Sequence, residues 1–150
     1  PAELARGQKK LRLAAMLLYS FPGSPTLYYG DEAGMQGFED PLNRGTYPWG
    51  GEDGSLLAFF RRLGQLRAER ISMQCGIIRY LHAQGGGLVV ERLHGTERTV
   101  TALNAGDTPL ELTLPWDGRL CIDAVTGQQF LSQNGTVHLT LPPLDGVILV

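Results

Sequence analysis

Residues 11–30, LRLAAMLLYSFPGSPTLYYG, decide the fold of the first part of the chain. The first half of this stretch is apolar at a spacing of three and four residues, which is the period of a helix. One apolar stripe consists of Leu11, Ala14, Ala15 and Leu18, and a second, adjacent stripe consists of Leu13, Met16 and Leu17. Because the two stripes together cover much of the helix circumference, we predict a deeply buried helix.

A turn and a short apolar run follow this helix. Pro22 and Pro25 stop the helix, and Gly23 is available for the turn between them. The β-prone residues 26–29 predict a buried strand. A single parallel strand cannot stand alone, because its backbone donors and acceptors need neighbouring strands, and residues 1–70 offer no second candidate.

A long loop and a second helix come next. Residues 31–53 are rich in Gly, Pro, Asp and Asn and have no periodicity, and a loop of this length usually carries function or forms a lid. Asp53 or Ser55 can then cap a helix with one apolar face. That face consists of Leu56, Phe59, Phe60, Leu63 and Leu66. Helix, strand, loop and helix in this order are typical of a parallel α/β sheet or barrel.

The period of the sequence changes to two near residue 70. Apolar and polar residues alternate in three clear runs, at 110–114, 120–124 and 137–141, and each run predicts a half-buried strand. In the second run Leu120, Ile122 and Ala124 are the inward positions, alternating with Cys121 and Asp123. Turn residues at short intervals indicate about seven or eight strands, which is typical of an antiparallel sandwich.

Composition and charge exclude several classes of function. The chain has 150 residues, 43% hydrophobic and 19% charged, with a net charge of −2, so no positive field would gather nucleic acid. The longest apolar run, residues 13–19, is too short to span a membrane. Cys75 and Cys121 lack the spacing of a metal site, so we predict two free thiols, no metal and no cofactor.

The sequence resembles a known family from residue 21 onward. Residues 21–35, FPGSPTLYYGDEAGM, resemble the last barrel strand and following loop of the α-amylase family of glycoside hydrolases. The resemblance continues through Gly37, the segment DPLNR at 40–44 and the segment YPW at 47–49. The order of these pieces looks most like neopullulanase, maltogenic amylase and cyclomaltodextrinase, with oligo-1,6-glucosidases and related α-glucosidases close behind.

The resemblance implies an α+β fold class with two parts. Residues 1–70 are expected to form the end of a (β/α)8 catalytic barrel, with its seventh helix, last strand, loop and eighth helix. Residues 71–150 are expected to form an all-β antiparallel C-terminal sandwich. The implied parent is a retaining hydrolase of α-glucosidic bonds in maltodextrins, cyclodextrins or pullulan.

The bond-cutting carboxylates are not expected in this chain. In the family the nucleophile Asp, the acid/base Glu and a third Asp precede the seventh barrel helix, so the resemblance places them upstream of Pro1. Asp31 and Glu32 are a tempting pair, but adjacent side chains at a strand end point to opposite faces. We therefore expect these two residues to hydrogen-bond neighbouring loops, and the chain alone to be inactive.

Four loop residues are the candidate substrate-binding residues: Asp40, Arg44, Tyr47 and Trp49. In the resembling enzymes the matching Asp and Arg contact sugar hydroxyls at non-reducing-side subsites, and a carboxylate and a guanidinium suit that task. The alternative is an Asp–Arg pair that only clamps the loop. The rings of Tyr47 and Trp49 could stack on a sugar or pack within the loop.

Other aromatic and histidine residues have simpler interpretations. We expect Tyr28 and Tyr29 to pack in the core, and Trp116 to pack under a sandwich turn in preference to a surface sugar contact. The histidines at 82, 94 and 138 have no carboxylate or cysteine companions, so we interpret them as solvent-facing strand residues.

Two further hypotheses remain beside the hydrolase. The chain could be a non-catalytic carbohydrate-binding or accessory module, or an interaction domain that self-associates through the apolar surface of an incomplete barrel. The expected partner in the intact enzyme is an α-glucan oligosaccharide, without nucleic acid or membrane. No signal peptide is visible, and a cytoplasmic location is expected.

Overall fold

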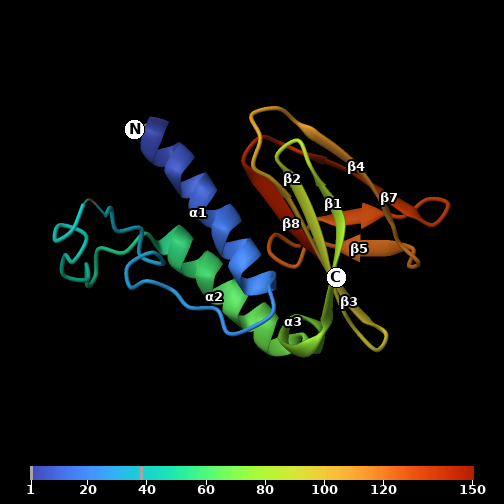
Figure 1. Cartoon of the computed structure of the whole chain (residues 1–150), viewed down its shortest axis with the longest axis horizontal. Coiled ribbons are helices and arrows are strands. Elements are labelled where there is room, and N and C mark those ends of the chain that lie inside the picture. The colour runs from blue at the N-terminus through green and yellow to red at the C-terminus, as the bar shows by residue number, and fades with distance from the viewer. Residues whose placement is uncertain (1, 38) are drawn as a thin grey trace.

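The computed structural model describes residues 2–37 and 39–150 as a helical layer packed on a group of antiparallel strands (Figure 1). The helices are α1 (Ala2–Ser20), α2 (Gly54–Glu69) and the short α3 (Ile71–Cys75). The segment between α1 and α2 contains no helix or strand among its described residues, and it extends away from the strands.

The two long helices pack against each other through the faces that carry large apolar residues. All five predicted apolar positions of α2 are buried, and Asp53 caps this helix by accepting hydrogen bonds from the backbone of Ser55 and Leu56. Helix α1 is buried on one side only, at Leu13, Ala15, Met16, Tyr19 and Ser20. The prediction of a helix buried over most of its circumference is therefore wrong, because only one face of α1 has other elements packed on it.

Eight strands follow, and all their pairings are antiparallel. Their bounds are β1 (Ile77–Gln84), β2 (Gly87–His94), β3 (Glu97–Asn104), β4 (Leu110–Pro115), β5 (Leu120–Ile122), β6 (Gln129–Leu131), β7 (Thr136–Leu141) and β8 (Asp145–Leu149). Strands β1-β2-β3-β8 form one sheet in that order, and β4 with β7 and β5 with β6 form two further pairs. The predicted antiparallel β architecture is confirmed.

Strands β2 and β3 are buried on both faces of the four-stranded sheet, whereas the edge strand β1 is mostly exposed, which explains why β2 and β3 do not simply alternate between apolar and polar residues. Val100 and Ala102 of β3 point into a core shared with β4 and β7. Leu103 of β3 and Ile148 of β8 point the other way, into a core shared with α1 and α2. The sheet therefore lies between the helices and the rest of the sandwich, with one core on each of its faces.

At Leu120, Cys121 and Asp123 the inward and outward positions are opposite to the prediction, whereas Ala124 is buried as predicted. Cys121 is fully buried and Asp123 is 1% exposed, whereas Leu120 is 38% exposed. Asp123 can be buried because its carboxylate accepts hydrogen bonds from Val125 N, Thr126 N, Thr126 Oγ1 and Ile148 N. These bonds bind the turn after β5 to β8.

The predicted buried strand at residues 26–29 is also wrong. These residues form no strand, and the side chains of Tyr28 and Tyr29 are 53% and 44% exposed rather than in the core. No strand of the described chain runs beside them to receive their backbone hydrogen bonds, and an extended segment without such partners is not a strand.

A buried polar cluster joins the helices to the sheet. Arg92 of β2, 1% exposed, donates to the carbonyl oxygens of Ser20 and Gly76, at the ends of α1 and α3. The hydroxyls of Ser20 and Thr101 lie 2.6 Å apart. The unsatisfied carbonyls that a helix leaves at its C-terminus are thereby paired.

Both cysteines are free thiols, as predicted; Cys75 is exposed and Cys121 is buried. Burial raises the pKa of the Cys121 thiol. Within residues 2–37 and 39–150, no helix is long and apolar enough to cross a membrane. The same residues contain no group of three or more side chains arranged to hold a metal ion.

Candidate functional site

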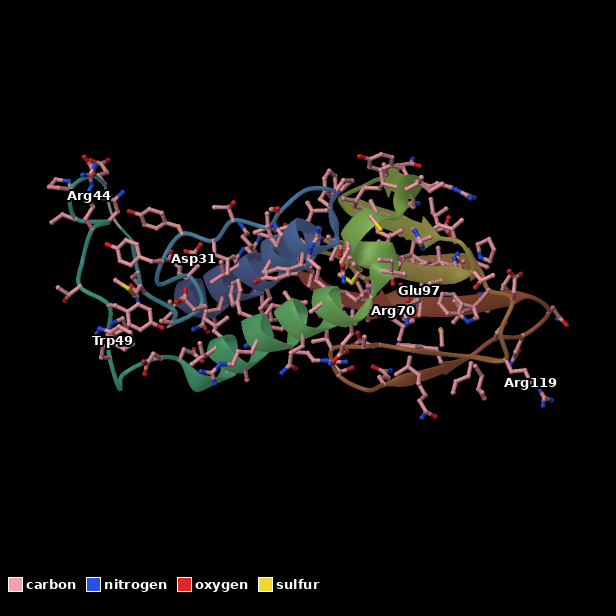
Figure 2. All side chains as sticks on the ribbon, turned by 90° about the horizontal axis from the view of Figure 1, so that it is seen from below. Asp31, Arg44, Trp49, Arg70, Glu97 and Arg119 are labelled. Carbon is pink, nitrogen blue, oxygen red and sulfur yellow. The ribbon has the colours of Figure 1, made fainter. Side chains whose placement is uncertain are left out.

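The predicted substrate-binding residues lie on the loop between α1 and α2, at the end of the molecule away from the sandwich (Figure 2). The loop is tied to both helices near its end. Asp53 N donates to Ala33 O over 2.9 Å, and the Asp53 carboxylate, which caps α2, accepts from Gln8 of α1 over 2.9 Å. These hydrogen bonds fix the end of the loop to its first residues and to α1.

A tight turn at Gly30–Met35 forms the first part of the loop. Met35 N donates to Gly30 O over 2.9 Å, and Gly30 has a φ of +93°. A Cβ added at Gly30 would clash with Met35 Sδ, and the positive φ at this position also favours glycine. The motif residues that carry the family resemblance thus have a structural purpose in this turn.

Asp40 and Arg44 lie together in the outer part of the loop. Arg44 Nε is 2.8 Å from Asp40 Oδ1, and both side chains are mostly exposed. Arg44 N also donates to Pro41 O over 3.0 Å. This geometry matches the loop clamp, and it also leaves the second carboxylate oxygen and the outer guanidinium nitrogens open to a ligand.

Tyr47 and Trp49 form an aromatic pair in the returning arm of the same loop. Their ring centroids are 4.6 Å apart at an interplanar angle of 51°. Trp49 is 86% exposed, while Tyr47 is partly buried. Figure 2 shows Trp49 and Arg44 on separate parts of the loop, so the structure brings the four candidates together as two pairs rather than one cluster.

Asp31 and Glu32 lie on the inner side of the loop. Glu32 Oε2 accepts a hydrogen bond from Gly30 N over 3.0 Å. Burial, and then the charge of Glu32, raise the pKa of the Asp31 carboxyl. Burial, and then the charge of Glu32, raise the pKa of the Tyr47 phenol. Glu32 is thus engaged by the loop itself.

Sequence reasoning missed one residue that shapes the loop. Tyr29, expected in the core, donates its hydroxyl to Gly45 O over 3.0 Å and so links the two arms of the loop. Periodicity could not find this contact, because it joins loop segments that have no repeating pattern.

The hollow beside these residues is small. It is lined by Tyr28, Tyr29, Asp31 and Asn43, among others, and has a volume of about 160 Å³. Pockets that enclose small ligands usually have at least about 300 Å³. The loop therefore offers an open wall rather than a closed pocket.

Trp116 does not form an exposed platform. It is 7% exposed, and its indole Nε1 donates to Leu120 O over 3.1 Å. The guanidinium of Arg98 lies 4.8 Å from the centre of its ring. The prediction that Trp116 packs under a turn is confirmed.

Comparisons with known proteins agree with this arrangement, although no family model matches the chain. An amylopullulanase of Thermoanaerobacter thermohydrosulfuricus is 34% identical over 157 residues, which cover 95% of the chain and 11% of that protein. Neopullulanase 2 of Thermoactinomyces vulgaris is 31% identical over 153 residues, covering 95% of the chain and 26% of that protein. The chain thus spans a minor part of the length of these relatives.

The structural likeness extends over the same residues. The crystal structure of an Anoxybacillus α-amylase, described as a new glycosyl hydrolase subclass, superposes with a TM-score of 0.86 at 29% identity. The superposition covers 94% of the chain and 32% of that protein. Over 95% of its length the chain matches proteins of the α-amylase family of glycoside hydrolases, in the part that forms their C-terminal domain.

Proposed function

We propose that the chain is the C-terminal part of a retaining α-glucosidic-bond hydrolase that acts on maltodextrins, cyclodextrins or pullulan. The observation that carries this proposal is the match, over 95% of the chain, to proteins named amylopullulanase and neopullulanase. The chain covers only a fraction of each, so the activity belongs to the whole protein.

In this proposal residues 1–70 complete a (β/α)8 barrel and residues 71–150 form the C-terminal sandwich. Two features support the barrel. Residues 26–29 follow a proline-bounded turn and lack strand partners in this chain, as the last strand of a barrel would without its neighbours. The hollow on the outer side of α1 is lined only by Ala14, Leu17, Leu18 and Phe21, an apolar surface that suits burial against further elements.

The same apolar surface should cause self-association when the 150 residues are isolated. Light scattering of the purified chain at increasing concentration tests this directly. We expect a mass above that of the 16.4 kDa monomer. A stable monomer at all concentrations would contradict the proposed exposure of a barrel-facing surface.

Asp40, Arg44, Tyr47 and Trp49 are proposed to form part of the wall that binds the α-glucan. The Asp40–Arg44 pair can accept from and donate to neighbouring sugar hydroxyls. The exposed ring of Trp49 can pack on the apolar face of a glucose unit. Their position on the loop farthest from the sandwich supports this assignment.

The chain alone is proposed to lack hydrolytic activity, since the resemblance assigns the catalytic carboxylates to a preceding part of the family's sequence. Asp31 and Glu32 are poor substitutes, because a carboxylate oxygen of Glu32 already accepts a hydrogen bond from Gly30 N. A chromogenic maltoside should therefore not be cleaved by the 150 residues. Turnover that disappears on changing Asp31 or Glu32 would contradict this assignment.

Binding is tested by titrating the chain with maltohexaose while backbone NMR signals are followed. We expect shifts confined to residues 28–53 and weakened by Trp49→Ala, with Trp116→Phe as the matched control. Shifts centred on Trp116 instead would favour the accessory-module alternative. Shifts in neither region would contradict the proposed binding wall.

A further inference from the structure

Gly45 is the point at which the outer arm of the loop, residues 39–50, rests on the inner arm, residues 28–37. The hydroxyl of Tyr29 donates to Gly45 O over 3.0 Å. A Cβ placed at Gly45 would lie 3.6 Å from Met35 Cε, so the glycine also lies against the side chain of Met35. Among the described residues, the bond from Tyr29 is the one hydrogen bond that joins the two arms. The position of the outer arm therefore depends on Tyr29.

Tyr29 itself is held by the inner arm. The next residue, Gly30, accepts from Met35 N over 2.9 Å and so closes the turn. Ala33 of the same turn is buried, and its carbonyl accepts from Asp53 N at the start of α2. The ring centroids of Tyr29 and Tyr28 are 5.0 Å apart. The hydroxyl of Tyr29 thus belongs to a segment that is tied to the helical layer.

Gly45 lies between the two pairs of candidate binding residues. The charged pair, Asp40 and Arg44, directly precedes Gly45 and is joined by an ion pair of 2.8 Å. The aromatic pair, Tyr47 and Trp49, follows it; its rings are 4.6 Å apart, and Trp49 N donates to Tyr47 O over 2.9 Å. Because each pair is linked internally and Gly45 is the junction between them, a bond that holds Gly45 acts on both pairs.

We propose that Tyr29 is a positioning residue, which holds Gly45 and thereby sets how the charged pair and the aromatic pair lie relative to each other in the wall that binds the α-glucan. This inference rests on the proposed function for its ligand, whereas the hydrogen bond itself is a property of the loop. Tyr29 acts through the backbone of Gly45 and not through a contact with the sugar. Without the hydroxyl the outer arm keeps its internal bonds, but the two pairs no longer present a fixed arrangement to one ligand.

The hydrogen bond is tested first without any sugar, by NMR of Tyr29→Phe. This change removes only the hydroxyl and keeps the ring beside Tyr28, so the fold is retained. We expect the carbonyl carbon signal of Gly45 to move upfield, as for a carbonyl that loses a hydrogen bond, and the amide signals of Arg44 and Tyr47 to change with it. Tyr28→Phe is the matched control, because Tyr28 is the neighbouring residue and is exposed to a similar extent, and its hydroxyl has no hydrogen-bond partner among the described residues.

The indole signal of the buried Trp116 is an internal check that each variant remains folded. A change at Gly45 that occurs in Tyr29→Phe and not in Tyr28→Phe supports the proposal. If Tyr29→Phe leaves the Gly45 signal as in the unchanged chain, or if the two variants change it equally, the proposal is overturned.

The effect on the ligand is measured in the maltohexaose titration. Tyr29→Phe should weaken binding by roughly two- to tenfold, which corresponds to the net contribution of one hydrogen bond. Tyr28→Phe should leave the affinity unchanged. Equal binding by Tyr29→Phe and the unchanged chain would overturn the positioning of the sugar-binding wall.

Combination with Trp49→Ala separates positioning from a direct contact with the sugar. If Tyr29 acts through the position of the aromatic pair, the double variant should weaken binding by less than the product of the two single fold-changes. A full product would count against the proposal, because Tyr29 would then act independently of Trp49. If the unchanged chain does not bind maltohexaose, the proposed binding wall fails, while the Gly45 signal still decides whether Tyr29 holds the outer arm.

Discussion

Arg92 Nη1 donates to the carbonyl oxygen of Ser20 over 2.7 Å, joining two residues that are 72 positions apart in the sequence. The same guanidinium donates through Nε and Nη2 to Gly76 O, over 3.2 and 2.8 Å. Arg92 has no acidic partner among the described residues and is 1% exposed. Its charge is instead compensated by carbonyl groups at the ends of α1 and α3, where the helix dipole is negative.

Replacing Arg92 with Met should therefore destabilise the fold strongly. The substitution fills much of the volume but leaves the carbonyls of Ser20 and Gly76 buried without donors. We expect a loss of about 3 kcal/mol in the free energy of unfolding, measured by urea titration. The control is Arg119→Met at an exposed turn, which should change stability by less than about 0.5 kcal/mol. Equal effects of the two variants would contradict the role of Arg92.

The Asp123 carboxylate should be nearly as sensitive. Its two oxygens accept four hydrogen bonds, and Asn in the same place offers only one acceptor oxygen. We expect Asp123→Asn to cost about 2 kcal/mol in thermal or urea unfolding. Asp117→Asn, at an exposed turn, is the matched control and should be close to neutral.

The turn at Gly30 can be tested by comparing two glycines with similar backbone angles. Gly23 has a φ of +101° and open space around a new Cβ, whereas at Gly30, with a φ of +93°, a new Cβ meets Met35 Sδ. Both Ala substitutions carry the backbone penalty of about 1 to 2 kcal/mol. Gly30→Ala should cost at least about 1 kcal/mol more, because the Met35 side chain must move. Identical unfolding curves for the two variants would show that Met35 adapts without cost.

Acid stability should depend on Glu97. Burial acts to raise the pKa of this carboxyl, but hydrogen bonds from Ser72 and the charge of Arg70 outweigh it, so the pKa lies below its ordinary value. A carboxyl with a lowered folded-state pKa stabilises the fold above the unfolded value of about 4.3, and this contribution disappears as the pH falls through the folded-state pKa.

The stability difference between the unchanged chain and Glu97→Gln should therefore shrink as the pH is lowered below about 4. Asp31, whose pKa is raised by burial and by Glu32, has the opposite dependence, so the comparison must use the variant and not the pH profile alone. Urea unfolding at several pH values measures the difference. A gap that stays constant over this range would exclude a contribution from the Glu97 charge.

Helices and most strands could be predicted from the sequence because their patterns are local. The spacing of Leu56, Phe59 and Leu63 defines the buried face of α2, and Val137, Leu139 and Leu141 define that of β7. The residues that recur at the period of the helix or strand are the ones that the structure buries. Local pattern is therefore sufficient where one element has one apolar face.

The prediction failed where burial depends on partners elsewhere in the chain. Asp123 is buried because Ile148 and the following turn supply donors, and no feature of residues 120–124 reveals them. Residues 26–29 have the composition of a strand but no strand beside them. In the candidate site the aromatic and charged residues could be recognised from the sequence, yet the hydrogen bond from Tyr29 to Gly45 joins two aperiodic segments and could not be predicted.

The shared sheet also constrains the order of events during synthesis. Leu13 of α1 lies in the same core as Ile148 of β8 and would touch a Cβ placed at Gly146, so the first helix packs against the last strand. A ribosome that has delivered α1 and α2 must still make all eight strands before this packing surface exists. During that interval the part of α1 that packs on the sheet is uncovered, and it is the part of the nascent chain on which we expect chaperones to act.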